Sequence, residues 1–167
     1  MVIAPNKFRD EEYFEPKALF EEAGAKVVTA SKGTRRATGM LGGSAGVDLE
    51  LSKADAADYA AVVFVGGVGA AIYFNDPAAL ALAKAAAAQR KVVAAICIAP
   101  SILANAGLLK GLSATSFPSE EANLVAKGVR YTGEAVTVDG LIVTARDPKA
   151  ARLFGKTVLD IITRKTN

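Results

Sequence analysis

Cys97 is the residue most able to do chemistry in this sequence, and it is the only cysteine among 167 residues. It lies in the stretch AAICIAP, where an apolar run typical of a buried strand gives way to a helix opened by Pro100. A side chain at such a turn projects into the crevice at the carboxyl ends of the strands, as in a nucleophile elbow. The amides at the start of a helix favour a thiolate, so this position predicts a lowered pKa for the thiol. The alternative is that Cys97 fills space in the core as a small apolar side chain.

The sequence contains no histidine, so neither one chain nor a homo-oligomer of it can supply an imidazole base. A single cysteine cannot form an internal disulfide, and without histidine the ligands of a typical zinc site are missing. We therefore expect no metal and no cofactor. A single free thiol suits a reducing compartment, and the N-terminus has no secretory pattern, so we expect a cytoplasmic protein.

A glycine-rich stretch, VGGVGAA, follows another apolar run. It is not a dinucleotide-binding fingerprint, because the third glycine of that pattern falls on Ile72 and the stretch does not follow the first strand. We expect Gly66 and Gly67 to bring backbone amides close to a bound atom, as an oxyanion hole requires. The alternative is a turn that needs glycine only for its backbone conformation.

Four carboxylates crowd the start of the first expected helix: Asp10, Glu11, Glu12 and Glu15. Most of them are expected to be solvated or to complement the helix dipole. A carboxyl that points into the crevice beside Cys97 would be buried, and burial would raise its pKa. It would then stay protonated and donate a hydrogen bond to the sulfur.

The elements that must position these residues alternate between short β-rich runs and longer alanine-rich runs, which predicts an α/β fold with a mostly parallel sheet and helices on both faces. Strands are expected at residues 1–5, 26–31, 57–67, 91–97 and 113–117, and helices at 10–25, 76–90, 99–107 and 148–163. Hairpins are expected within 38–52 and at Asp139-Gly140. No repeat or linker divides the chain, so residues 1–167 form one domain.

Composition excludes several functional classes. The net charge is only +3, and the basic residues are mostly scattered, which favours a solvated surface over nucleic-acid binding. The 18 residues between Lys91 and Lys110 carry no charge and approach the length of a membrane span. Pro100 and Asn105 within this run, and the change of periodicity at Cys97, favour a buried strand followed by a helix. We therefore expect no membrane partner.

The stretches FRDEEYFEP, VFVGGVGA, AAICIAP, TSFP and VDGLIVTARDP together resemble the ThiJ/PfpI superfamily, which has a class I glutamine amidotransferase-like fold and includes the DJ-one-like proteins. The resemblance implies a flavodoxin-like α/β sandwich with a small β-hairpin, and a homodimer or higher homo-oligomer. The family has a glutamate four residues before a proline in its first helix, which here selects Glu12 before Pro16. Its reactive cysteine selects Cys97, and its oxyanion-type amides select Gly67 and Ile98.

The sequence also departs from the family in its histidines. PfpI-type peptidases resemble this sequence but have a histidine directly after the cysteine, where this chain has Ile98. DJ-one-like members bring a histidine from the strand after the elbow helix, and the comparable stretch TSFP offers Ser116 and Phe117. Peptidase activity is therefore not expected.

Three functions remain open. In the first, an enzyme of glyoxalase or hydrolase type acts on a small carbonyl compound: Cys97 adds to the carbonyl, Glu12 moves a proton, and the amides of Gly67 and Ile98 hold the oxyanion. In the second, a non-catalytic redox or stress-response protein has its cysteine oxidised. The third is a binding protein with a vestigial pocket. Arg146 either lines the pocket or pairs with a surface acid.

Overall fold

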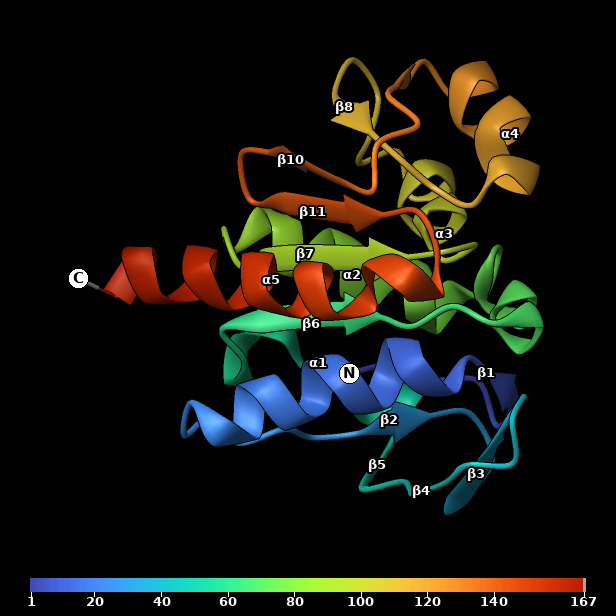
Figure 1. Ribbon diagram of the computed structural model, residues 1–167, viewed down its shortest axis with the longest axis vertical. Coiled ribbons are helices and arrows are strands. Elements are labelled where there is room, and N and C mark those ends of the chain that lie inside the picture. Colours follow the sequence, from blue (N-terminus) through green and yellow to red (C-terminus); the bar gives the residue numbers. More distant parts are fainter. Residues whose placement is uncertain (167) are drawn as a thin grey trace.

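The computed structural model describes residues 1–166, and its middle layer is a mostly parallel β-sheet (Figure 1). The main strands, in their order across the sheet, are β10 (Val136–Asp139), β11 (Ile142–Ala145), β7 (Val92–Ile96) and β6 (Ala61–Phe64). Only β10 is antiparallel to its neighbour. Val2 forms single bridges to Phe64 and to Ala30, and so links this sheet to the short parallel pair β2 (Ala30–Ser31) and β5 (Leu49–Glu50).

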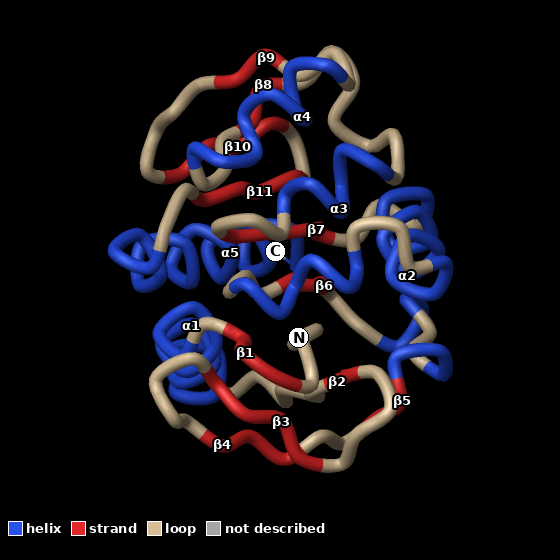
Figure 2. The backbone as a smooth tube through the Cα atoms, turned by 90° about the vertical axis from the view of Figure 1, so that its right-hand side faces the viewer, coloured by secondary structure: helices blue, strands red, loops and turns tan. Residues whose placement is uncertain are grey.

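Helices cover both faces of the sheet, which confirms the expected α/β sandwich (Figure 2). One face carries α1 (Asp10–Glu22) and α5 (Ala151–Thr166), and the other carries α2 (Pro77–Ala88) and α3 (Pro100–Asn105). The helices α1 and α5 approach closely at Gly155, where a Cβ atom would lie 2.9 Å from the Cα of Pro16. A small side chain at this point lets α1 settle onto the sheet beside α5.

The central strands are apolar throughout because both of their faces are covered. All five residues of β7 are buried, as a strand between two helical layers requires. On α2 the buried residues are Ala79, Leu82, Ala83 and Ala86, which recur at helical spacing. The Asp76 carboxylate caps this helix by accepting hydrogen bonds from the amides of Ala78 and Ala79, at 3.0 and 3.1 Å.

Smaller elements flank the sandwich. Near the start of α1, β1 (Asn6–Phe8) lies parallel to β3 (Arg36–Gly39), which forms a hairpin with β4 (Ser44–Gly46). Beside α3, the pair β8 (Ser113–Ala114) and β9 (Arg130–Tyr131) lies with α4 (Glu121–Ala126). The hairpin predicted at Asp139-Gly140 joins β10 to β11, with Asp139 opposite Ile142.

Four predicted strands are shorter than expected. The strand expected at 57–67 is limited to Ala61–Phe64, and the one expected at 113–117 to Ser113–Ala114. In 26–31 only Ala30–Ser31 is a strand, because the amide of Thr29 binds the Asp48 carboxylate at 2.8 Å instead of a neighbouring strand. In 1–5 only Val2 is bridged to neighbouring strands. Pro5 has no amide to donate, and the chain turns there into β1, which the sequence pattern did not predict.

The long uncharged run folds as the buried strand β7 followed by α3, as expected. Among the described residues, no helix combines the length and the apolar character needed to cross a membrane.

Candidate active site

Cys97 directly follows β7 and has the backbone conformation of a nucleophile elbow. Its φ angle is +65°, a left-handed value that is uncommon for any residue other than glycine. The turn is held on both sides, because the Cys97 amide donates to the Ala145 carbonyl at 2.9 Å and the Cys97 carbonyl accepts from the Phe117 amide at 2.7 Å. The side chain is buried, with the residue 8% exposed. The predicted elbow is therefore present at the carboxyl end of the sheet.

Gly66 and Gly67 follow β6 and lie against Cys97. A Cβ atom at Gly66 would lie 2.6 Å from the Cβ of Cys97 and 2.5 Å from Oε2 of Glu12. At Gly67 the φ angle is +90°, and a Cβ atom would lie 2.3 Å from the backbone nitrogen of Arg9. Both positions therefore need glycine for close approach, and Gly67 also needs it for its backbone conformation.

The amides around the sulfur have different partners. The N–H groups of Gly67 and Ile98 lie near the Cys97 sulfur, where they favour its ionised form. The N–H group of Gly66 donates instead to Oε2 of Glu12 at 3.0 Å. Gly66 therefore positions the carboxyl, while Gly67 and Ile98 are the two amides that face the reactive atom.

Glu12 is 0% exposed and lies beside the thiol. Its second oxygen, Oε1, has no well-formed hydrogen-bond partner among the described residues, although the carboxyl and the thiol are close enough for each to shift the other's pKa. Burial raises the pKa of Glu12 from 4.5 to about 8, in the direction expected for a carboxyl in this crevice. At neutral pH, Glu12 is mostly protonated.

The expectation of a lowered pKa for Cys97 is wrong. Burial raises the pKa of the thiol to about 12, and the charge of ionised Glu12 adds to this effect. The amides of Gly67 and Ile98 act in the opposite direction but do not outweigh burial. The helix that was expected to favour the thiolate begins only at Pro100 and is six residues long. The first proton that the pair loses therefore comes from Glu12, and the thiol keeps its own proton until a base removes it.

The other three carboxylates at the start of α1 have different roles. Asp10 is buried and accepts hydrogen bonds, at 2.8 and 2.7 Å, from two amides in the turn between β3 and β4. Glu11 forms a two-pronged ion pair with Arg9, at 2.8 and 3.0 Å. Glu15 lines an outer cleft. Among the four carboxylates, Glu12 alone reaches the sulfur.

An open cleft of about 670 Å³ lies beside the elbow and is lined by Arg9, Glu11, Glu15, Phe117, Asp147, Pro148 and Lys149. Arg146 does not line it. Its guanidinium pairs with Asp147 at 3.0 Å and donates to the Gly133 carbonyl at 2.9 Å. Of the two roles left open for Arg146, the structure favours pairing with a neighbouring acid.

The stretch TSFP lies next to Cys97 but supplies no base. Its Ser116 hydroxyl is taken up by a hydrogen bond to the Phe117 carbonyl at 3.0 Å, and the Ser116 carbonyl accepts from the Tyr131 hydroxyl at 2.9 Å. Ser116 is buried in this loop. The loop therefore supports the elbow through its backbone.

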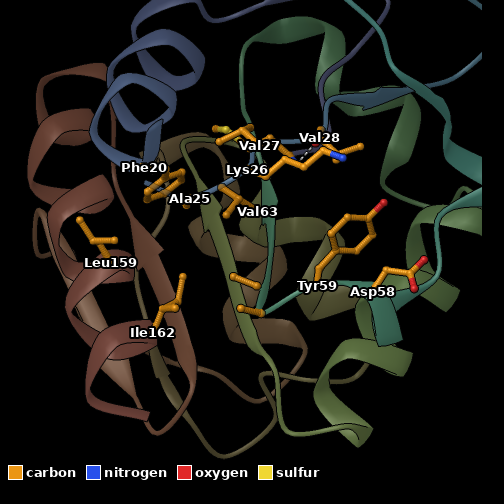
Figure 3. A pocket seen from close by; sticks show the side chains of 13 residues that line it. Phe20, Ala25, Lys26, Val27, Val28, Asp58, Tyr59, Val63, Leu159 and Ile162 are labelled. Atoms are coloured by element: carbon orange, nitrogen blue, oxygen red, sulfur yellow. Dashed lines mark hydrogen bonds between the residues drawn. The ribbon is translucent and has the colours of Figure 1, made fainter. Parts of the chain in front are cut away.

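A second cavity, of about 170 Å³, lies near the amino-terminal end of β6, at the opposite end of the strands from Cys97 (Figure 3). It is mostly apolar, with Phe20, Val63, Leu159 and Ile162 on one side and Lys26, Asp58 and Tyr59 on the other. It contains none of the groups around Cys97, so we place the candidate active site at the carboxyl ends of the strands. Among residues 1–166 no three acidic, cysteine or histidine side chains gather closely enough to hold a metal ion.

Comparison with known proteins supports the resemblance seen in the sequence. The model of the DJ-1/PfpI family matches residues 1–161. The uncharacterised protein MJ0967 of Methanocaldococcus jannaschii is 44% identical over 98% of this chain and 82% of its own. Deglycase PH1704 of Pyrococcus horikoshii is 32% identical over 89% of each chain. The crystal structure of a ThiJ/PfpI domain protein from Brachyspira murdochii superimposes with a TM-score of 0.95 at 36% identity, covering 98% of this chain and 94% of that one.

Proposed function

Because the chain belongs to the DJ-1/PfpI family, we propose that it is a cysteine-dependent enzyme of glyoxalase or hydrolase type that acts on small carbonyl compounds. One observation carries this proposal: a buried carboxyl, Glu12, lies beside the thiol of Cys97, on which two backbone amides converge. The relative named a deglycase favours carbonyl chemistry over peptide cleavage. The free thiol is consistent with action in the cytoplasm.

The first chemical step needs no imidazole. The sulfur of Cys97 attacks the carbonyl carbon while its proton passes to the Glu12 carboxylate, so the S–H bond breaks as the S–C bond forms. The electron pair of the C=O bond moves to oxygen, and the amides of Gly67 and Ile98 stabilise that charge. Glu12 then returns the proton to the oxygen, which yields a thiohemiacetal. The proton moves from sulfur to oxygen overall, and Glu12 alone relays it.

The absence of histidine argues against a PfpI-type peptidase. Peptide cleavage must protonate an amine leaving group after attack, which is the task of the histidine in cysteine peptidases. Ile98 occupies the position after the cysteine, and Ser116 is held by its own loop. Addition to an aldehyde or ketone has no leaving group in its first step. The site therefore needs no additional acid to protonate one.

Turnover of methylglyoxal tests the proposal. We expect Cys97→Ala to abolish turnover and Glu12→Gln to lower it by about 10²–10⁴-fold, the usual contribution of a general acid-base group. Because Glu12 must be ionised to accept the proton, wild-type turnover is expected to rise with pH through about 8, and Glu12→Gln is expected to lose this rise. Glu15→Gln makes the same chemical change on the same helix, away from the sulfur, and serves as the control. Turnover that Cys97→Ala leaves unchanged would refute the proposal.

A redox or stress-response role is the second candidate, and the unpartnered Oε1 of Glu12 favours it. An oxygen atom added to Cys97 by peroxide could accept a hydrogen bond from protonated Glu12, which would stabilise a sulfenic or sulfinic acid. Mass spectrometry after graded peroxide treatment tests this role. If Cys97 is oxidised in a folded protein that does not turn over methylglyoxal, the result supports the redox role over the enzymatic one. If Cys97 stays unmodified, the redox role is excluded.

A further inference from the structure

We propose that the aromatic ring of Phe117 selects the substrate and favours uncharged carbonyl compounds whose carbonyl carbon carries a flat, apolar substituent. The carbonyl group lies at the sulfur of Cys97, and its substituent packs against the ring in the neighbouring cleft. Phe117 is then a specificity-determining residue. The inference deepens the proposed function and rests on it in taking Cys97 as the group that reacts with a carbonyl compound. Its test measures the selectivity of Cys97 without turnover, so the two can fail separately.

The backbone of Phe117 is fixed next to the reactive residue. Its amide donates to the Cys97 carbonyl at 2.7 Å, and its carbonyl accepts from the amide of Glu120 at 2.9 Å. Pro118 follows and favours an extended conformation at Phe117, where φ is −58° and ψ is 141°. The loop is tied a second time to α3, because the buried Ser101 hydroxyl donates to the Glu120 carboxylate at 2.6 Å. A substrate that packs on the ring therefore does not have to order this loop.

The ring of Phe117 is exposed although the backbone that carries it is bound. The residue is 41% exposed and lines the open cleft beside the elbow. Among residues 1–166, it belongs to none of the three apolar clusters of the core, and its ring pairs with no other aromatic ring. Such a ring contributes little to the packing of the core, and its flat apolar face is free to contact a ligand in the cleft.

The other walls of the cleft favour an uncharged substituent. Pro148 adds a second apolar surface, and the cleft, at about 670 Å³, has room for an aromatic group. The charges at the cleft balance one another, as two ion pairs and two further charges of opposite sign. They are the pairs Arg9–Glu11 and Arg146–Asp147 and the residues Glu15 and Lys149. The cleft therefore has no net charge that would attract an ionised substituent.

The experiment compares three bromomethyl ketones that differ only in the substituent on the carbonyl: phenacyl bromide, bromoacetone and bromopyruvate. With each reagent the sulfur of Cys97 displaces bromide, so an S–C bond forms as the C–Br bond breaks, and the thiol proton passes to the Glu12 carboxylate. Mass spectrometry follows the modification of Cys97, and each rate is divided by the rate of the same reagent with free cysteine. In wild type, the corrected rate should be about 3- to 10-fold higher for phenacyl bromide than for bromoacetone, the usual contribution of one pair of aromatic rings. Bromopyruvate should react no faster than bromoacetone.

Variants of Phe117 assign this preference to the ring. Phe117→Ala should make the corrected rates of phenacyl bromide and bromoacetone equal to within about twofold, and Phe117→Tyr, which keeps the ring, should retain the preference. If the ring only blocked access to Cys97, its removal would instead favour the larger reagent. Val125→Ala is the control, because Val125 is also an exposed apolar residue, at 53%, but lies on α4 and does not line the cleft.

Several results would overturn the inference even if methylglyoxal is turned over. They are a wild-type protein that shows no preference for phenacyl bromide or that prefers bromopyruvate, a Cys97 that none of the reagents modifies, and a preference that Phe117→Ala leaves unchanged or increases. Conversely, a protein that shows the expected selectivity but does not turn over methylglyoxal would contradict the proposed function and support the role of Phe117.

Discussion

Glu12 and Cys97 share a buried space in which neither charge is well solvated. Burial raises the pKa of both, and the carboxyl loses its proton first, near pH 8. Once Glu12 is ionised, the thiol of Cys97 has a base beside it, but the sulfur itself is still protonated and uncharged. Reactivity therefore depends on proton transfer within the pair and on the two amides that face the sulfur, because burial keeps the pKa of the thiol high.

The raised pKa of Glu12 predicts how stability depends on pH. The carboxyl ionises near 4.5 when unfolded and near 8 when folded, so the folded state binds more protons between these values. Stability contributed by protonated Glu12 is complete below about pH 4.5 and is lost as the pH rises through about 8. Glu12→Gln should remove this slope and be more stable than wild type by on the order of a few kcal/mol above pH 8.

Thermal unfolding at a series of pH values measures this effect. Glu15→Gln is again the matched control, because it makes the same chemical change in a partly exposed side chain of the same helix. Equal slopes in wild type and Glu12→Gln would mean that Glu12 is not held protonated by burial.

Gly66 predicts a steric requirement at the site. In Gly66→Ala the added methyl would overlap both Glu12 and Cys97, and we expect a loss of about 1–3 kcal/mol in unfolding free energy together with a large fall in Cys97 alkylation. Gly46→Ala is the control, because a Cβ atom there meets nothing within 4 Å and the residue does not have a positive φ. Chemical denaturation and alkylation measure the two effects. Equal stability and equal alkylation rates in Gly66→Ala and Gly46→Ala would contradict the close packing described at the elbow.

Among the elements, the β3–β4 hairpin depends on α1 through Asp10. The carboxylate binds two amides of the turn, so it joins the start of α1, where Glu12 lies, to a hairpin about 30 residues away in the sequence. Asp10→Ala would leave both amides without this partner and should cost about 1–3 kcal/mol. Hydrogen exchange of the Leu41 and Gly43 amides should accelerate.

Asp55→Ala provides the comparison for Asp10→Ala. Asp55 also accepts from a backbone amide, that of Ala57 at 2.9 Å, but in an exposed turn where water can replace the carboxylate. Its loss should have a smaller effect on stability and none on the β3–β4 turn. Unchanged exchange at Leu41 and Gly43 in Asp10→Ala would show that the turn holds without α1.

On the scale of the whole molecule, we propose that the chain self-associates through an apolar surface on α1 and the β3–β4 turn. This surface consists of Phe14, Met40 and Leu41, and Leu41 is 64% exposed. The three lie together, because Phe14 borders Gly43 and the turn binds the start of α1. Exposed apolar groups gathered in this way are typical of an interface, and identical chains most often associate as symmetric dimers.

Analytical ultracentrifugation tests self-association. Leu41→Glu places a charge within the surface and should weaken association at least tenfold, since a charge buried at an interface without a partner is costly. Leu153→Glu is the control, because Leu153 is also exposed but lies on α5. A monomeric wild-type protein, or equal weakening by both variants, would count against this surface.

Much of the fold could be predicted from local patterns. Some features can be recognised from a short stretch of sequence, and each of these lies where it was expected. They are the apolar runs of β6 and β7, the Asp76 cap of α2 and the Asp139-Gly140 turn. The short strands β1 and β2 were harder to predict, because their hydrogen bonds are made with residues far away in the sequence. The amide of Thr29, for example, binds Asp48.

In the candidate site, too, some features follow from the local sequence and others depend on the tertiary structure. The sequence by itself determined that Cys97 follows a buried strand at a sharp turn, that glycines follow the neighbouring strand, and that no imidazole is present. The resemblance to the family selected Glu12, but residue type and spacing alone did not distinguish it from Asp10, Glu11 and Glu15. Only the tertiary structure decided that Glu12 lies beside the sulfur and that the pKa of Cys97 is raised. The physical reason is that side-chain type and local conformation belong to the chain segment, whereas burial, and with it the energy of a charge, depends on every element packed around the group.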